Sequence, residues 1–383
     1  MTETRQNWFE ANPKKTLFSV IIISFLAIDF GTAAFLKAIG KFEPSYVTSS
    51  IREAYFRKAN PIYHHDLAAN INAFKADWGG LNYLISINSL GFKDTAPREV
   101  PLTTTQPRLL IIGDSFTEGV GVEYPDTFAG KLDTHLAKKN ISVLNAAATS
   151  YAPIIYYRKV KYLIETKGIQ FDRLMVFVDL SDMEDEALGY EFDENENVIS
   201  RGSIAHIGRT NVTDNSKPEL RKPKASFKQF FTDNTVFLAQ LRNLSKYIKR
   251  VRKPWDRSLN KRRGMWTLDD ALYKEYGAKG VKLAELHMTQ LKQLVDKHHI
   301  KMTLVIYPWP DQIYHKDINS KHVKVWQNWS RQNNVTLINL FPTFINMGDP
   351  KQTITDNFFQ GDVHWNKQGH DVVYQALVKT FHH

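Results

Sequence analysis

Two short stretches of this chain, far apart in sequence, hold the residues that could do chemistry. An apolar run ends in the letters GDSF, which contain Ser115, and a stretch near the C-terminus reads DVHWN, which contains Asp362 and His364. A serine hydroxyl attacks a carbonyl carbon when a histidine removes its proton, and a carboxylate on the other ring nitrogen fixes the histidine tautomer. Because members of such a triad commonly meet only in the fold, the sequence predicts Ser115 as nucleophile, His364 as base and Asp362 as the carboxylate that orients it.

Each stretch also has a plainer interpretation. A serine after a strand is commonly a helix N-cap, and an isolated D-x-H sequence is more often a surface loop. A metal at His364 is disfavoured, because only Asp362 and His370 stand near it and no second histidine follows four residues later. We favour catalysis because the two stretches occur together, and we expect no metal and no cofactor.

The elements that must position these residues are strands and helices that alternate from Arg108 onward. Apolar runs predict strands at residues 108–112, 141–144, 173–178, 301–307 and 336–340. The intervening patterns predict helices over residues 126–138, 154–166, 271–298, 323–333 and 368–381. Continuous apolar strands separated by helices are typical of a parallel sheet covered on both faces. Ligands bind beyond the carboxyl ends of such strands, where Ser115 follows the first strand and His364 precedes the last helix.

The 383 residues divide into four predicted parts. Residues 1–16 are a polar tail, 17–36 an apolar span, 37–107 a mixed connector, and 108–383 a catalytic domain. Polar composition predicts an insertion in that domain at about residues 189–265, which includes an amphipathic helix over 227–251.

Residues 17–36, LFSVIIISFLAIDFGTAAFL, form the one segment of membrane length. About 20 apolar residues suffice to cross a bilayer. A signal peptide is the rival interpretation, but its core is usually shorter and residues 32–34 match a cleavage site only weakly. We therefore predict an uncleaved anchor whose orientation the flanking Lys and Arg residues do not decide. The single charge, Asp29, is costly in lipid, so we expect it to face a partner helix, to be neutral or to lie near the interface.

The chain is basic, with a formal net charge of +10 and an isoelectric point near 9.4, and it has no cysteine. The lack of cysteine excludes disulfides, thiolate catalysis and cysteine-ligated zinc. Basic residues are densest from Lys246 to Arg263, against the single acid Asp256. Such a run is either a solvated surface or a contact for anionic lipid or an acidic glycan. We expect no nucleic-acid partner, because no nucleic-acid-binding motif is found and the chain has a membrane-length segment.

With these residues the chain resembles the SGNH, or GDSL-like, hydrolases from about Arg108 to the C-terminus, the 189–265 region excepted. The letters GDS at Ser115 resemble the family's first block, and D-x-H at Asp362 and His364 resembles its last. The resemblance implies a flavodoxin-like three-layer α/β/α fold with a mainly parallel sheet, and a Ser–His–Asp esterase or acyltransferase. The phrases GDVHWN and YPWP also resemble those of membrane-anchored members linked to bacterial surface polysaccharides.

The chain departs from the family pattern at three places. Where the second block offers a glycine N–H to the oxyanion, the turn NAAATSY places Ser150, whose backbone N–H remains. Where the third block carries G-x-N-D, this chain reads DLSD, so Ser181 would donate through its hydroxyl. The oxyanion hole that the resemblance implies therefore consists of Ser115, Ser150 and Ser181. The terminal pair is D-x-H rather than D-x-x-H, which leaves Asp356 as an alternative to Asp362.

These features predict a serine-dependent ester hydrolase or O-acyltransferase that acts on acyl esters, foremost acetyl esters, of a carbohydrate or cell-surface polysaccharide. Residues 17–36 would hold it in a bacterial inner membrane as a single-pass protein, with the catalytic domain in the periplasm. The alternative is a catalytically degenerate relative that binds glycan or assists polysaccharide assembly at the membrane. Four tryptophans could stack on sugar rings, although tryptophan more often packs in a core or at its rim; they are Trp309, Trp326, Trp329 and Trp365.

Overall fold

The structure is a computed structural model that describes residues 7–39, 42, 53, 55–79, 81–201, 230–231, 234–241, 244 and 255–379. The chain forms two compact units, one of residues 1–51 and 219–252 and the other of residues 52–218 and 253–383. The larger unit holds the sheet and all the predicted site residues.

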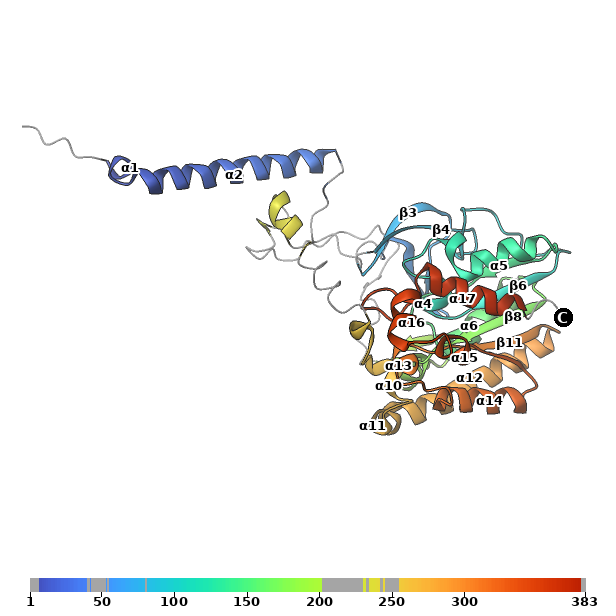
Figure 1. The fold of residues 1–383 in the computed structure, drawn as a ribbon. Helices are drawn as coiled ribbons and strands as arrows, with labels where there is room; N and C mark the ends of the chain where they lie inside the picture. Colours follow the sequence, from blue (N-terminus) through green and yellow to red (C-terminus); the bar gives the residue numbers. More distant parts are fainter. Residues whose placement is uncertain are drawn as a thin grey trace, which may run out of the picture. The chain divides into compact units, whose positions relative to one another are not determined.

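An eight-stranded mixed sheet runs through the larger unit (Figure 1). Its parallel part consists of β6 (Arg108–Ile112), β7 (Ser142–Asn145), β8 (Arg173–Val178), β11 (Lys301–Ile306) and β12 (Thr336–Asn339). These strands lie in the order β7-β6-β8-β11-β12, which is the 2-1-3-4-5 order of flavodoxin-like folds. Every residue of β6 is buried, as expected for a parallel strand covered on both faces. The predicted α/β fold with a flavodoxin-like parallel sheet is confirmed.

Helices cover the two faces of the sheet. In Figure 1, α5 (Phe128–Ala137) and α17 (Lys367–Val378) lie on one side, and α12 (Ala278–Lys297) and α14 (Lys321–Gln332) on the other. α6 (Pro153–Lys161) packs against α12. Buried Val323, Trp326 and Trp329 recur every three residues along α14, so one face of that helix meets the core. The shorter helices are α4 (Ser115–Glu118), α7 (Asp182–Glu184), α10 (Arg262–Met265), α11 (Asp270–Leu272), α13 (Pro310–Tyr314), α15 (Phe341–Ile345) and α16 (Pro350–Asn357).

The region between residues 57 and 94, predicted as part of a connector, instead adds strands to this fold. β3 (Ile71–Trp78), β4 (Leu81–Ile87) and β5 (Lys93–Asp94) continue the sheet beyond β7 with antiparallel pairing. β1 (Arg57–Asn60) and β2 (His64–Leu67) form a separate antiparallel hairpin. Ile85 and Ile87 of β4 are fully buried in the same core as β6. The expected boundary at residue 107 therefore does not separate two bodies.

The predicted insertion opens with a hairpin of β9 (Tyr190–Phe192) and β10 (Val198–Ser200). Residues 202–229 and 245–254 lie outside the described residues. Of the helix predicted over residues 227–251, positions 230–231, 234, 236–241 and 244 are described and are helical.

The smaller unit contains α1 (Trp8–Ala11) and α2 (Pro13–Ala38). Among the described residues, α2 alone is long and apolar enough to cross a membrane, with a mean hydropathy of 2.1 in its most apolar window. It contains the whole predicted span of residues 17–36. A membrane anchor and an N-terminal signal sequence both satisfy this criterion.

Candidate active site

A sharp turn at the carboxyl end of β6 presents Ser115. A Cβ atom on Gly113 would lie 2.2 Å from the hydroxyl oxygen of Thr117, so only glycine fits there. Asp114 then caps α4 by accepting the N–H of Phe116 at 2.9 Å. Ser115 is the first residue of α4, where backbone N–H groups have no partner inside the helix. The turn therefore places the Ser115 hydroxyl at the edge of the sheet beside its own backbone N–H, which has no partner among the described residues.

The structure brings Ser115, His364 and Asp362 together. The Oγ atom of Ser115 lies 2.7 Å from Nε2 of His364, and Nδ1 of the same ring lies 2.7 Å from Oδ1 of Asp362. Asp362 Oδ1 also accepts the N–H groups of the next two residues, at 2.6 and 3.4 Å. This tight turn is the reason a two-residue spacing still sets the carboxylate on the ring. Asp356, the alternative, accepts a hydrogen bond from Gln352 within α16.

Trp78, the last residue of β3, adds a fourth side chain to this group. Its indole N–H donates to Oδ2 of Asp362 at 2.9 Å, and its ring meets the His364 ring edge to face with centroids 5.0 Å apart. One oxygen of Asp362 is thus held by His364 and the other by Trp78. The carboxylate cannot turn away from the imidazole without losing one of these bonds.

Electrostatics favour an imidazole that binds a proton readily. Burial alone would lower the pKa of His364, but the charge and hydrogen bond of Asp362, together with the charges of Asp114 and Asp179, raise the pKa above its ordinary value. For Asp362 burial would raise the pKa, but His364 and the Trp78 N–H hold it well below the usual range. Asp362 is therefore ionised at neutral pH. A proton taken by His364 would be stabilised by this fixed negative charge.

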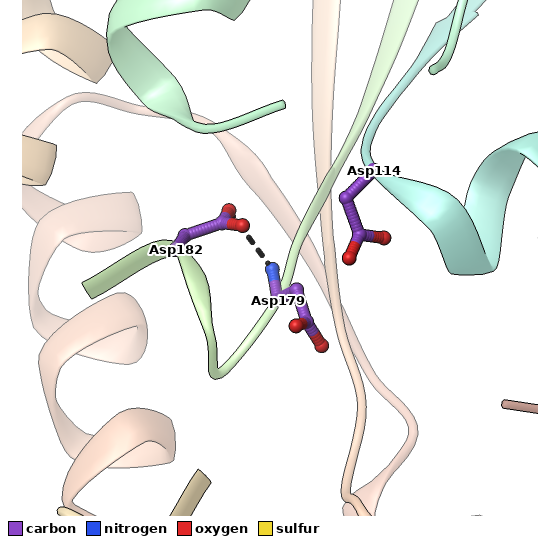
Figure 2. A group of neighbouring side chains, drawn as sticks. All are labelled: Asp114, Asp179 and Asp182. Atoms are coloured by element: carbon purple, nitrogen blue, oxygen red, sulfur yellow. Dashed lines mark hydrogen bonds between the residues drawn. The ribbon is translucent and has the colours of Figure 1, made fainter. Parts of the chain in front are cut away.

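Behind Ser115 lies a buried group of three carboxyl groups, which we call the acid cluster: Asp114, Asp179 and Asp182. Figure 2 shows the three side by side, with the backbone N–H of Asp179 donating to Oδ2 of Asp182 at 3.1 Å. Burial and the charge of Asp179 raise the pKa of Asp114 to about 8. Burial and the neighbouring carboxylates raise the pKa of Asp182 well above its usual value. Ser115 Oγ lies 3.2 Å from Oδ2 of Asp114. Whether Asp114 is protonated therefore affects the electrostatic environment of the proposed nucleophile.

One oxygen from each member of the acid cluster lies within 4.8 Å of the others, close enough to hold a metal ion together. In the described part of the chain this is the one such group of three or more carboxylate or histidine side chains. Most of these oxygens already accept hydrogen bonds. Tyr307 donates to Asp114, Trp309 donates to Asp179, and Tyr156 donates to Asp182. Among the carboxyl oxygens of the acid cluster, only Oδ1 of Asp182 is buried with no hydrogen-bond partner within the described residues. Because protein donors already occupy these oxygens, few of them are open to a cation.

The turn that carries Ser150 is held by contacts from several elements. Ser150 has a left-handed backbone with φ of 64°, the conformation that glycine adopts most easily. Glu118, on α4 with Ser115, accepts the N–H of Thr149 at 2.8 Å and its hydroxyl at 2.9 Å. Arg57 of β1 donates from both terminal nitrogens to Glu118, at 2.7 and 2.8 Å. Burial would raise the pKa of Glu118, but the Arg57 charge lowers it overall, so the pair is ionic.

The hairpin of β1 and β2 also touches this turn through His65. Its Nε2 lies 2.7 Å from the carbonyl oxygen of Thr149. Tyr190 of β9 donates to the carbonyl oxygen of Ser150 at 2.8 Å. Both carbonyl groups of the turn are thus tied down. The N–H of Ser150 donates to no protein group among the described residues.

Ser181 lies at the carboxyl end of β8 but its hydroxyl is already engaged. It donates to Oδ2 of Asp179 at 2.5 Å, and its N–H donates to the same oxygen at 3.0 Å. The hydroxyl would have to leave Asp179 before it could serve an oxyanion. Of the three predicted oxyanion donors, Ser115 and Ser150 therefore have backbone N–H groups without a partner in the described part of the chain, whereas the Ser181 hydroxyl is bonded to Asp179.

The four tryptophans considered for sugar stacking are packing residues. All of them are buried, with exposed fractions of 4 % or less: Trp309, Trp326, Trp329 and Trp365. Trp365 packs in parallel against Phe344 with ring centroids 6.1 Å apart, and edge to face against Phe116 at 4.8 Å.

Most of the basic run from Lys246 to Arg263 lies outside the described residues. Within the described end of that run, Arg262 pairs with Glu184 and Glu275, and Arg263 pairs with Asp185. This end of the run is therefore largely neutralised inside the larger unit.

Sequence reasoning missed Trp78, Glu118 and Arg57. Trp78 meets Asp362 across 284 positions, and Arg57 meets Glu118 across 61. No local pattern links such residues. The sequence could have drawn attention to Glu118, because it lies about one helical turn after Ser115. Its full burial, which demands a partner, is seen only in the structure.

No protein-family model and no curated protein matches the sequence. Solved structures do resemble it. An acetyl xylan esterase, AlAXEase, is 15% identical with a TM-score of 0.40, covering 71% of this chain and 98% of its own. The psychrotrophic esterase EstA from Pseudoalteromonas sp. is 12% identical with a TM-score of 0.37, covering 72% and 99%. A lipolytic protein of the G-D-S-L family from Veillonella parvula is 11% identical with a TM-score of 0.38, covering 72% and 98%.

Proposed function

We propose that this protein is a serine-dependent ester hydrolase or O-acyltransferase. The observation that carries the proposal is the unbroken chain of short contacts from Ser115 Oγ through His364 to Asp362, each 2.7 Å long. A hydroxyl in that position can lose its proton to Nε2 while Nδ1–H stays bonded to the carboxylate. The same three residues serve both reactions.

In the proposed mechanism Ser115 Oγ attacks the carbonyl carbon of an acyl ester as its proton passes to His364. His364 then returns that proton to the departing alcohol oxygen, which leaves an acyl group on Ser115. A second alcohol or water, deprotonated by His364, attacks the acyl carbonyl carbon; the bond from that carbon to Ser115 Oγ breaks, and His364 returns the proton to Oγ. Water makes the reaction hydrolysis, and a sugar hydroxyl makes it acyl transfer.

The negative oxygen formed at each step requires donors. Ser115 and Ser150 offer backbone N–H groups, and Ser181 would join them only by giving up its bond to Asp179. Removing one donor from such a site typically lowers kcat by about 10²–10³. A site with two backbone donors remains competent in this proposal. The occupied Ser181 hydroxyl is also the observation that favours the second candidate, a degenerate protein that binds glycan without turning it over.

The proposed substrate is an acetyl or other acyl ester of a carbohydrate, which rests on the resemblance of the YPWP and GDVHWN phrases. We further propose that residues 17–36 anchor the protein in a bacterial inner membrane with the larger unit in the periplasm. The helical character and apolar length of α2 support the anchor.

The test is turnover of 4-nitrophenyl acetate by the full chain in detergent, with and without an oligosaccharide acceptor. We expect acetate on Ser115 by intact-mass and peptide analysis, and a loss of turnover of at least about 10³-fold in Ser115→Ala. Ser142→Ala, a serine of β7 remote from His364 in the fold, should keep its rate. Glycan binding that Ser115→Ala leaves unchanged, with no acetylated protein, would instead identify the degenerate binding protein.

A further inference from the structure

Asp29 is the one charged residue within the apolar span, yet it is buried in the smaller unit. Its Oδ1 accepts the backbone N–H of Val236 at 2.9 Å and that of Phe237 at 3.0 Å, and its Oδ2 lies 3.3 Å from the latter. These N–H groups stand at the start of helical residues 236–241, where a helix leaves donors without internal partners. A carboxylate in apolar surroundings is costly unless hydrogen bonds satisfy it. The Asp29 carboxylate therefore gains two hydrogen-bond donors, and the two N–H groups gain an acceptor.

The same segment packs on α2 at other points. The rings of Phe25 and Phe237 meet edge to face with centroids 5.4 Å apart, and those of Phe30 and Phe231 at 5.8 Å. Nearer the end of α2, Lys37 donates to the side chain of Asn234 at 2.8 Å. Aromatic and polar contacts thus hold residues 230–231 and 234–237 beside the apolar helix.

Much of the apolar surface of this segment remains exposed. Five of its side chains are 38–52 % exposed: Phe230, Phe237, Leu238, Leu241 and Leu244. The exposed residues of α2 are apolar as well, among them Ile21, Ile23 and Ile28. Large contiguous patches of exposed apolar side chains are rare on soluble proteins and mark sites of interaction with other proteins or with membranes. Directly after Leu244 the sequence turns basic, as suits anionic headgroups, with Lys246, Lys249, Arg250 and Arg252.

We propose that residues 230–231, 234–241 and 244 belong to a second lipid-embedded segment, fastened to α2 by the Asp29 carboxylate. The occupant of its exposed apolar face is the acyl-chain region of the bilayer. This inference rests on the proposed anchoring by α2 and adds a second membrane contact drawn from inside the predicted insertion. Asp29, which is costly to bury in lipid, is in this proposal the residue that binds the second segment to α2.

The test uses the absence of cysteine, which makes single-cysteine variants unambiguous. The full chain is reconstituted in vesicles of phosphatidylcholine and phosphatidylglycerol and treated with a membrane-impermeant maleimide. The thiol of Leu241→Cys tests whether the proposed segment lies in lipid, and that of Ile22→Cys tests α2. Leu286→Cys lies on the exposed face of α12 and serves as the control for a thiol in water. We expect the thiols of L241C and I22C to stay unlabelled in vesicles and to react after SDS denaturation, whereas L286C reacts throughout.

The Asp29 contact is tested by adding D29L to L241C, with T32V, another polar residue of α2, as control. Labelling of L241C should rise toward that of L286C with D29L and stay low with T32V. Labelling of L241C in the native sequence, with I22C protected, would overturn the second segment while the anchor stands. Reactive I22C would instead refute the anchor itself. Protection of L241C that survives D29L would overturn the role of Asp29.

Discussion

At the scale of single residues, the site depends on which groups hold the carboxylate. Asp362 lies two positions before His364, and a tight turn with two backbone N–H bonds brings it onto the ring. Trp78 then occupies its other oxygen. The sequence could show that an acid precedes the histidine, but not that an indole from residue 78 would fix its rotation. Trp78 is a positioning residue, because it acts through Asp362.

Replacing Trp78 by Phe should keep the ring against His364 and remove the N–H. Hydrogen bonds to charged groups contribute about 1.5–3 kcal/mol, and part of this remains through the backbone donors, so we expect kcat to fall about tenfold with KM little changed. Steady-state kinetics with an acetyl ester measure the effect. Trp255→Phe, whose ring stacks on Tyr314, is the matched control and should keep its kcat. Equal kinetics for W78F and the native chain would contradict the positioning role.

The pH profile of kcat/KM should show the raised pKa of His364. A general base works only when unprotonated, so activity appears as pH rises through the pKa of His364, which lies above its ordinary value of about 6.5. In Asp362→Asn the largest of the charges that raise the pKa of His364 is gone while burial still lowers it, so the midpoint should move to lower pH. An acid limb that stays in place in D362N would show that another group sets it.

At the scale of elements, the parallel strands could be predicted and the antiparallel ones could not. The predicted bounds of β6 and β8 match those observed, because both are continuous apolar runs buried on two faces. β4 has mixed burial along its length, and β5 is two residues long, so neither gives a clear period. The hairpin of β1 and β2 bears on the site through Arg57, His65 and Asp66, which no local pattern could connect to the Ser150 turn.

Glu118→Gln should loosen that turn, because a neutral amide at this position would lose the ionic bond to Arg57 and offer Thr149 a weaker acceptor. If the turn positions the Ser150 N–H, we expect kcat to fall about 10–100-fold, below the cost of deleting a donor outright, with KM little altered. Glu186→Gln is the control: it is also a buried acid, and it accepts the N–H of Ile154 and contacts His287. A comparable fall in kcat for both variants, at equal folded fraction, would reduce the effect to general destabilisation.

At the scale of the whole molecule, residues before β6 belong to the same core as the predicted catalytic segment. The buried ion pair of Lys159 on α6 and Asp66 on β2, 2.8 Å apart, joins the two. Tyr63 also donates to Asp66, at 2.6 Å. The predicted catalytic domain, which begins at residue 108, left out Tyr63 and Asp66. The strands before residue 108 are short, so their sequence gives no clear pattern of buried residues.

Asp66→Asn should leave the Lys159 ammonium unpaired in the core. Breaking one side of a buried pair typically costs about 3–5 kcal/mol, so the free energy of unfolding in urea, followed by circular dichroism, should fall by that amount. Asp371→Asn, in a more exposed pair with Lys131, should cost at most about 1 kcal/mol. Similar losses in the two variants would show that Asp66 contributes no more than a surface charge.

The pairing of β5 with β7 has a practical consequence for anyone who trims this protein. β5 meets β7 at one residue pair, Lys93 with Asn145, and holds β4 and β3 in the sheet. A fragment that starts at Arg108 loses these three strands, with buried Ile85 and Ile87, and exposes the apolar core that they cover. Exposed apolar surface favours association with other chains, so such a fragment should precipitate or associate during expression. A fragment that begins before Arg57 and keeps the whole sheet should stay dispersed by size-exclusion chromatography.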